Sequence, residues 1–139
     1  ENKSHVVAAL IRKVHRSLER KSNTVEIMGS GTPQRELIFI DDLVDACLFV
    51  MDGYNGDDPI NIGTGRAISI VELAKLIKEV VAFEGRIEFD KSKPDGAPKK
   101  LLDSTPLFNL GWRPQVGLEE GIHLTYKWYC EQLDAGISP

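Results

Sequence analysis

The residues best suited to chemistry gather in one stretch, residues 29–42, where an arginine follows a glycine-rich turn. Two glycines and a proline favour a tight turn there, and the apolar run 37–40 is typical of a short buried strand. Arg35 therefore lies just before that strand. A guanidinium in this place can offer a planar pair of donors to a phosphate or a carboxylate. The alternative, which the sequence leaves open, is an ion pair with a neighbouring carboxylate: Glu36, Asp41 or Asp42.

His5 is the histidine with the most distinctive position. It is expected in the first turn of an N-terminal helix, next to Ser4 as the capping residue. The positive end of a helix disfavours imidazolium, so a neutral imidazole there can act as a base or as a hydrogen-bond donor. The alternative is a histidine with a structural role only. His15 and His123 lie inside amphipathic helical patterns and give no comparable signal.

Two further loops have compositions that suit an anion. Residues 93–103 contain three lysines and a rigid turn, and such a loop can close over an anionic ligand or be an ordinary solvated loop. Residues 62–67 begin like a dinucleotide fingerprint, but Ile68 occupies the position of its third glycine. No acidic residue completes that pattern, so we interpret this stretch as a tight turn. No catalytic triad, phosphate loop or metal-ligand cluster can be assembled, so no metal is expected.

Alternating helices and strands must position these residues. Spacing predicts helices from Val6 to Leu18, Leu43 to Met51, Ser69 to Val81, Ser104 to Leu110 and Leu118 to Tyr129, with strands over 24–28, 37–40, 60–62 and 86–90. Ser69 and Glu72 form a capping box. Asp41 or Asp42 can cap the second helix, and Ser104 or Thr105 the fourth. The second helix is strongly apolar and is expected to be well buried. The pattern predicts one α/β domain over residues 1–139, with a small sheet flanked by helices.

Composition narrows the class further. The chain has 139 residues and a net charge of −4, which suits one mildly acidic domain with its own core. Basic residues do not cluster, so no nucleic-acid partner is expected, and no apolar run is long enough to span a membrane. Cys47 and Cys130 fall in helical patterns and are expected to be buried thiols in a reducing, cytoplasmic location; a disulfide between them stays open. The first residue is Glu1 rather than Met, and we expect a fragment of a longer protein.

Together, these stretches resemble the C-terminal, substrate-binding part of the extended short-chain dehydrogenases/reductases, the superfamily of NAD-dependent epimerases/dehydratases. The stretches that carry the resemblance are 4–6, 29–42, 60–65, 89–103 and 110–112. The likeness covers nearly the whole chain and is greatest to the NADPH-dependent 3,5-epimerase/4-reductases that act on GDP-4-keto-6-deoxy-mannose. It implies a small substrate-binding domain that lacks the Rossmann half.

The resemblance also implies roles for individual residues. His5 matches a histidine that serves as acid/base in epimerisation and lies beside the nicotinamide cofactor. Arg35 matches an arginine that binds the GDP-sugar. Arg86 and Lys100 match basic residues around the nucleotide-sugar.

Four other positions are implied to lie at the substrate. Lys13 falls where the family often has a substrate-binding arginine, so it keeps the charge and loses the bidentate fork. Met28 replaces a tryptophan that packs near the nucleotide. Val6 and Leu10 are expected to line the pocket.

For the complete protein, the resemblance implies a GDP-sugar substrate, NADPH bound mainly by the absent N-terminal half, and a homodimer. An acid/base pair would move protons at C3 and C5, next to the 4-keto group that acidifies them, and hydride from NADPH would reduce C4. The fragment alone is expected to be inactive. One alternative is another nucleotide-sugar epimerase, dehydratase or decarboxylase; a second is a non-catalytic module that binds nucleotide sugars.

Overall fold

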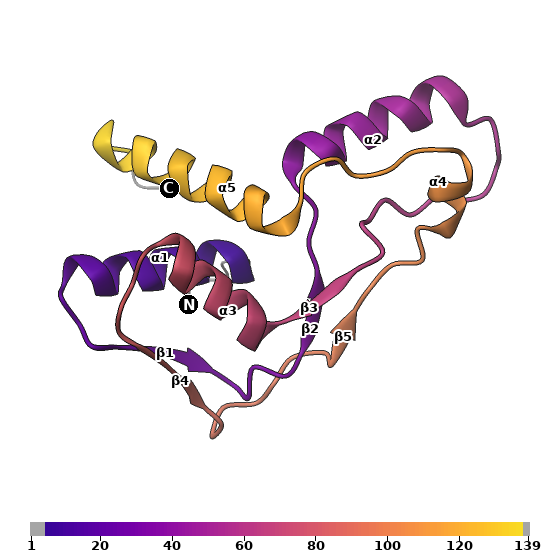
Figure 1. Ribbon diagram of the computed structural model, residues 1–139. Coiled ribbons are helices and arrows are strands. Elements are labelled where there is room, and N and C mark those ends of the chain that lie inside the picture. The colour runs from indigo at the N-terminus through magenta and orange to yellow at the C-terminus, as the bar shows by residue number, and fades with distance from the viewer. Residues whose placement is uncertain (1–4, 138–139) are drawn as a thin grey trace.

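The computed structural model describes residues 5–137 as an α/β arrangement of five helices and five short strands (Figure 1). In chain order these are α1 (Val6–Glu19), β1 (Thr24–Met28), β2 (Gln34–Glu36), α2 (Ile40–Gly53), β3 (Ala67–Ser69), α3 (Ile70–Val80), β4 (Arg86–Asp90), β5 (Lys99–Lys100), α4 (Thr105–Asn109) and α5 (Leu118–Asp134). The expected fold class, short strands flanked by about five helices, is confirmed.

The strands form two small sheets that are joined by the glycine-rich turn. β1 pairs with β4 in parallel, from Thr24 opposite Arg86 to Met28 opposite Asp90. β2 is the central strand of the second sheet, antiparallel to β3 and parallel to β5. The turn between β1 and β2 therefore carries the chain from one sheet to the other.

The main hydrophobic core lies between α1, α3, α5 and the β1–β4 pair. Figure 1 shows α1 and α3 above these two strands, with α5 on the far side of the helices. The apolar residues of each helix recur at three- and four-residue spacing, so one face of each is buried. The buried residues are Leu10, Ile11, Val14, Val25, Ile27, Leu73, Ala74, Ile77, Val81, Phe83, Ile122 and Tyr129.

A second, smaller cluster anchors α2, which stands apart from the main body in Figure 1. Ala46, Leu107 and Trp112 are its buried members. The indole Nε1 of Trp112 donates a hydrogen bond to the carboxylate of Asp45 at 2.8 Å. One side of α2 is thus fixed to α4 and to the chain that follows it.

The capping box expected at the start of α3 is confirmed. The Ser69 hydroxyl accepts from the Glu72 backbone N–H at 3.2 Å, and the Ser69 N–H donates to the Glu72 carboxylate at 3.0 Å. The Ser69 hydroxyl also donates to the Glu72 carboxylate at 2.6 Å, and this bond, followed by the bond from the Ser69 N–H, lowers the pKa of Glu72. The box caps the start of α3 directly after β3, so it also fixes where that strand ends.

Two predicted strands are wrong. β2 spans Gln34–Glu36, and the apolar residues 37–39 after it are irregular. These residues leave the sheet and lead into α2. Their side chains pack against other residues, but their backbone pairs with no strand. Residues 60–62 are also irregular, since none of the described strands pairs with them.

The expected burial of α2 is also wrong, because only one of its sides packs. Met51 is 78% exposed and Leu48 56% exposed. Cys47 is exposed on the same helix and Cys130 is partly buried, so the expectation of buried thiols is wrong for Cys47. Both thiols are free.

The helix starts differ from the predictions in detail. His5 is the N-cap of α1, one residue before the first turn, and Ser4 lies outside the described residues. Neither Ser104 nor Thr105 caps α4 with its side chain; the Asp103 carboxylate accepts from the Thr105 N–H at 3.0 Å instead. Between residues 5 and 137, no helix has the length and apolar character needed to cross a membrane.

Candidate functional site

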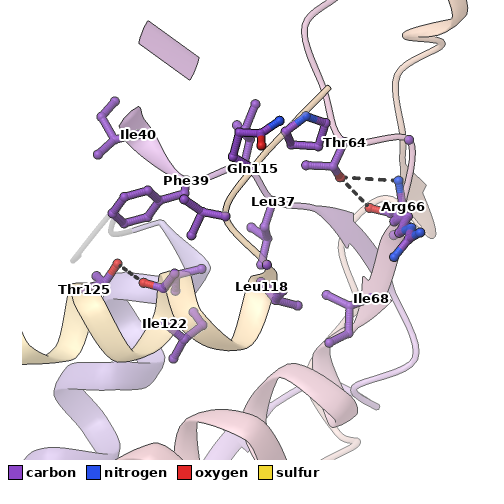
Figure 2. A pocket seen from close by; sticks show the side chains of 18 of the residues that line it. Leu37, Phe39, Ile40, Thr64, Arg66, Ile68, Gln115, Leu118, Ile122 and Thr125 are labelled. Carbon is purple, nitrogen blue, oxygen red and sulfur yellow. Dashed lines mark hydrogen bonds between the residues drawn. The ribbon is translucent and has the colours of Figure 1, made fainter. Parts of the chain in front are cut away.

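A groove of about 1120 Å³ lies between α5, the segment 37–40 and the turn at 64–66. Figure 2 shows apolar side chains gathered along it from both sides, with Thr64 and Arg66 at one end. Val7 of α1 also lines the groove. Its apolar lining includes Leu37, Phe39, Ile68, Leu118 and Ile122. Such a mixture of apolar walls and a few polar groups is typical of a small-molecule site.

Asp42 fixes one wall of this groove. Its side chain is 5% exposed, and its carboxylate accepts from the backbone N–H groups of Gln115 at 3.0 Å and Val116 at 2.9 Å. A capping role for Asp41 or Asp42 is therefore wrong, since Phe39 is the N-cap of α2 and lacks a side-chain bond. Asp42 instead turns inward and ties α2 to the segment before α5.

Glu36 joins three of the stretches that carried the family resemblance. Its carboxylate accepts from the Gly65 N–H at 2.7 Å and from the Leu102 N–H at 2.8 Å. Gly63 is required here, because a Cβ at this position would lie 2.5 Å from Glu36 Oε1. The sequence suggested Glu36 only as a partner of Arg35. No local signal was available for this role, because Gly65 and Leu102 lie 29 and 66 positions away in the sequence.

The lysine-containing loop is held against the turn between β1 and β2. Asp95 accepts from the Ser30 hydroxyl at 2.6 Å and from the Ser30 N–H at 2.8 Å. Both bonds from Ser30 lower the pKa of Asp95, and the bond from the hydroxyl has the larger effect. The loop 91–98 is exposed throughout, so this contact is one of the bonds that fix its course.

Arg35 and Lys100 lie opposite each other in the β2–β5 pair, and Ile68 lies opposite Arg35 in β3. Residues opposite each other in a sheet project to the same face. The two cations therefore form a row with Ile68, which lines the groove. Lys99 is opposite Gln34 and projects to the other face.

The guanidinium of Arg35 bonds carbonyl oxygens instead of the neighbouring carboxylates that the sequence suggested. Nη1 donates to the carbonyl of Gln34 at 2.7 Å and to that of Ala97 at 2.8 Å. Nη2 lies near Gly96, where a Cβ would approach to 3.2 Å. These bonds orient the guanidinium toward the loop 91–98.

The other cations expected at the substrate lie elsewhere. The Lys13 ammonium donates to the Glu26 carbonyl at 2.8 Å, across the contact of α1 with β1. Arg86 begins β4 opposite Thr24, whereas Met28 ends β1 at the opposite end of the pair and is 68% exposed. The structure therefore brings Arg35 and Lys100 together and leaves Lys13 and Arg86 apart from them.

The three predicted residues of α1 have different surroundings. His5 is exposed at the N-terminus of the helix. Val6 packs partly against the main core, and Leu10 lies within it at 3% exposure. Val7 is the residue of this turn that reaches the groove. The start of α1 thus adjoins the groove through Val7.

Sequence reasoning did not single out Arg66 or Arg113, which both line the groove. Arg113 lies over the ring of Phe108 at 4.7 Å and donates to the Phe108 carbonyl, so its role includes packing. Arg66 directly follows the turn glycine Gly65. A basic residue after a glycine turn was the only signal for it.

The described residues do not form a cradle for a dinucleotide. The N–H of Gly65, which a phosphate would need, is used by Glu36, and the carboxylate beside this turn would repel a pyrophosphate. Between residues 5 and 137, no three His, Cys, Asp or Glu side chains lie close enough together to hold a metal ion.

This fold resembles a part of the extended short-chain dehydrogenases/reductases. A model of the NAD dependent epimerase/dehydratase family matches residues 1–63. GDP-L-fucose synthase 1 of Arabidopsis thaliana is 47% identical over 130 residues, which are 94% of this chain and 40% of that protein. The chain is therefore homologous to GDP-L-fucose synthases, and the resemblance expected from the sequence is confirmed. The chain spans about 40% of the length of these plant relatives.

Solved structures support the same assignment. A GDP-L-fucose synthetase of Naegleria fowleri bound to NADP superposes with a TM-score of 0.89 at 27% identity, over 96% of this chain and 42% of that one. A UDP-glucose 4-epimerase of Thermotoga maritima with UDP-glucose gives a TM-score of 0.81 at 31% identity, over 95% and 41%. The fold is thus shared by enzymes with different nucleotide sugars.

Proposed function

We propose that this chain is the nucleotide-sugar-binding part of an NADPH-dependent GDP-4-keto-6-deoxy-D-mannose 3,5-epimerase/4-reductase, an enzyme that makes GDP-L-fucose. The observation that carries the proposal is the row of Arg35, Lys100 and Ile68 beside the groove. It offers two positive charges next to an apolar wall, which suits a pyrophosphate attached to a sugar and a base. The relatives that match this chain are named for the same substrate class.

The two cations would have different tasks. Arg35 is oriented by two carbonyl oxygens, so its remaining donors are fixed in direction. Lys100 lies at an exposed position and can follow the ligand as a point charge. The proposal also includes weaker contacts with the substrate at the margins of this site, made by Lys13, Arg86 and Met28.

His5 would move protons at C3 and C5 of the sugar. It is exposed at the N-cap of α1, next to Val6, and Val7 lines the groove. The 4-keto group acidifies both carbons, so His5 would serve as one member of an acid/base pair, in which one group removes a proton from one face and the other group delivers a proton to the opposite face. Leu10 would support the helix from within the core.

NADPH would supply the hydride for reduction at C4. The described residues do not fit this cofactor, because the only glycine turn that resembles a fingerprint is occupied by Glu36. We therefore infer that another part of a longer polypeptide holds the cofactor, and that residues 1–139 form one domain of it. The complete protein would act as a homodimer.

A chimera tests the proposed function. This chain would replace the matching 130 residues of GDP-L-fucose synthase 1 of Arabidopsis. We expect the chimera to form GDP-L-fucose and to exchange the C3 and C5 protons with solvent. Replacing His5 by Gln should abolish the exchange with folding intact. Unchanged exchange would reject the role of His5.

Substitution of one lysine tests the binding row. Lys100→Met in the chimera should raise the KM for the GDP-sugar by about tenfold, because one charge-assisted contact is lost. Lys99→Met is the matched control, since Lys99 projects to the other face of the same strand. Equal effects of the two substitutions would contradict the proposed row.

A second candidate function is a 4-epimerase that acts on another nucleotide sugar, and the similarity to the Thermotoga UDP-glucose 4-epimerase favours it. Such an enzyme would share the region of Arg35 and would not need His5. A substrate panel of GDP-, UDP- and dTDP-sugars with the chimera separates the two. Preference for a UDP-sugar, together with an active His5→Gln variant, would support the second candidate.

A further inference from the structure

Three side chains form a polar chain between the turn that follows β1 and the loop that follows β4, which lie beside each other in Figure 1. The hydroxyl oxygens of Thr32 and Ser30 are 2.7 Å apart, and the Ser30 hydroxyl is 2.6 Å from the Asp95 carboxylate. An ionised carboxylate only accepts, so Ser30 donates its proton to Asp95, and the Thr32 hydroxyl donates to Ser30. The Ser30 oxygen also accepts from the Thr32 N–H at 3.1 Å. The Ser30 hydroxyl is therefore fully used, and its direction is fixed.

The backbone of the turn is shaped to admit the Asp95 carboxylate. Gly29 has a φ of +88°, and a Cβ at this position would collide with an oxygen of Asp95. Glycine adopts such a φ without steric cost, and it leaves room for the side chain. The next residue then supplies the second bond, from the Ser30 N–H at 2.8 Å. Asp95 is nevertheless exposed, so its substitution should leave the fold intact.

The segment directly after Asp95 meets the strand that carries Arg35. The Ala97 carbonyl accepts from Arg35 Nη1 at 2.8 Å, and the Pro98 carbonyl accepts from the Gln34 N–H at 2.8 Å. A Cβ at Gly96 would lie 3.2 Å from Arg35 Nη2, so the backbone passes close to the guanidinium. Asp95 is thus fixed two residues before the carbonyl that orients Arg35, and a shift of Asp95 would move that acceptor.

The bonds with Ser30 also determine where the negative charge of Asp95 lies. Each of its two oxygens accepts one bond from Ser30. Between residues 5 and 137, no carboxylate lies within salt-bridge distance of the Arg35 guanidinium. Because Asp95 is adjacent in sequence to Gly96, its carboxylate would be free to turn toward Arg35 if Ser30 did not hold it. An ion pair of that kind would compete with any anionic ligand for the guanidinium.

We propose that Ser30 and Asp95 are positioning residues for the nucleotide-sugar site and act on the ligand through Arg35. They hold residues 95–98 so that the Ala97 carbonyl aims the guanidinium at the diphosphate, and they keep the Asp95 carboxylate away from that guanidinium. This inference rests on the proposed function. Neither residue touches the reacting carbons, so their loss should weaken binding of the GDP-sugar and leave the chemical steps unchanged.

Removal of one hydroxyl tests this role in the Arabidopsis chimera. Ser30→Ala is expected to raise the KM for the GDP-sugar by about fivefold with kcat unchanged, because Arg35 loses its orientation but stays in place. Ser30→Thr keeps the hydroxyl and should restore the KM. Ser92→Ala is the matched control, since the Ser92 hydroxyl also donates to a carboxylate at 2.6 Å, that of Asp90 at the start of the same loop. Equal KM values for Ser30→Ala and Ser92→Ala would overturn the proposal.

A double-mutant cycle separates positioning from direct contact with the ligand. Asp95→Ala alone should raise the KM by about fivefold, as Ser30→Ala does. In an Arg35→Lys background the guanidinium fork is already lost, so the same substitution should add almost nothing. If the two effects multiply in the double variant, Asp95 acts independently of Arg35 and the positioning role is rejected.

The order of the Arg35 side chain gives a measurement that needs neither substrate nor turnover. ¹⁵N relaxation of the Arg35 Nε–H group should show a more mobile guanidinium in Asp95→Ala than in the unsubstituted chain, and no change in Ser92→Ala. An equally ordered Arg35 in Asp95→Ala would overturn the inference whatever the enzyme does. A mobile Arg35 in Asp95→Ala, together with a chimera that makes no GDP-L-fucose, would instead reject the proposed function and leave the hold on Arg35 established.

Discussion

Ser30 and Asp95 lie 65 positions apart in the sequence and share two hydrogen bonds. The Ser30 hydroxyl donates to one carboxylate oxygen at 2.6 Å, and the Ser30 N–H donates to the other at 2.8 Å. Both bonds favour the ionised carboxylate, so the pKa of Asp95 is lowered from its usual value of 3.8. This pair is one of the contacts that hold the loop 91–98 beside Arg35.

Acid should release this loop. Because the pKa of Asp95 is lower in the folded protein, its bonds stabilise the fold fully above pH 3.8. The contribution is lost as the pH falls through the lowered pKa. Carboxyl ¹³C titration by NMR should show Asp95 titrating below 3.8, together with changes at the Ser30 amide. An Asp95→Asn variant should show no such step, and titration of Asp95 at or above 3.8 would contradict the assignment.

Gly63→Ala should destabilise the fold through one contact. The added Cβ would lie 2.5 Å from Glu36 Oε1, and overpacking of this kind costs about 2 kcal/mol of unfolding free energy. Urea denaturation measures the loss. Gly53→Ala is the control, since no atom lies within 4 Å of a Cβ there.

The cause of this loss is tested in a double-mutant cycle. In a Glu36→Ala background the clash is absent, so Gly63→Ala should cost almost nothing. Glu36→Ala itself should be destabilising, because the N–H groups of Gly65 and Leu102 lose their acceptor. Additive losses in the double variant would show that the two residues do not interact.

Asp42→Ala should loosen the wall of the groove. Two backbone N–H groups, those of Gln115 and Val116, would lose a buried charged acceptor. We expect a loss of about 3 kcal/mol of unfolding free energy, with large shifts of both amides in the NMR spectrum. Asp41→Ala, at an exposed site of the same helix turn, should change little. An equal loss in both variants would point to a general effect on the helix start.

The helices could be predicted because each buries a periodic face in this chain. α1 and α3 pack above the β1–β4 pair and α5 packs against α3, so each buries one face in the main core. Local signals such as the Ser69 capping box act within a few residues. The alternating strands 24–28 and 86–90 could be predicted for the same reason. Residues 37–40 and 60–62 have the composition of strands, but pairing is not a local property, and no described strand is available to them.

Long-range contacts explain most of what the sequence did not reveal about the site. Three contacts join residues that lie far apart in the chain. Arg35 pairs with Lys100, the Glu36 carboxylate accepts from the Leu102 N–H, and the Asp42 carboxylate accepts from the Gln115 N–H. His15 shows the same limit, because its Nδ1 lies 3.0 Å from the hydroxyl of Tyr126, which is 111 positions away in the sequence. The apolar composition of α2 predicted burial of the helix, but in the structure one of its faces, which carries Val44, Leu48 and Met51, is exposed.

Arg35→Lys should separate the charge of this residue from its geometry. A lysine keeps the positive charge, but it cannot reproduce the planar fork whose Nη1 donates to the Gln34 and Ala97 carbonyls. The ligand would therefore meet a cation that is no longer oriented, and we expect the KM of the chimera for its GDP-sugar to rise by about tenfold. Hydrogen exchange should also quicken in the loop 91–98, which loses its contact with Arg35. Arg20→Lys, at the exposed end of α1, is the control for a general effect of the substitution. An unchanged KM with a loosened loop would mean that Arg35 serves the loop and not the nucleotide sugar.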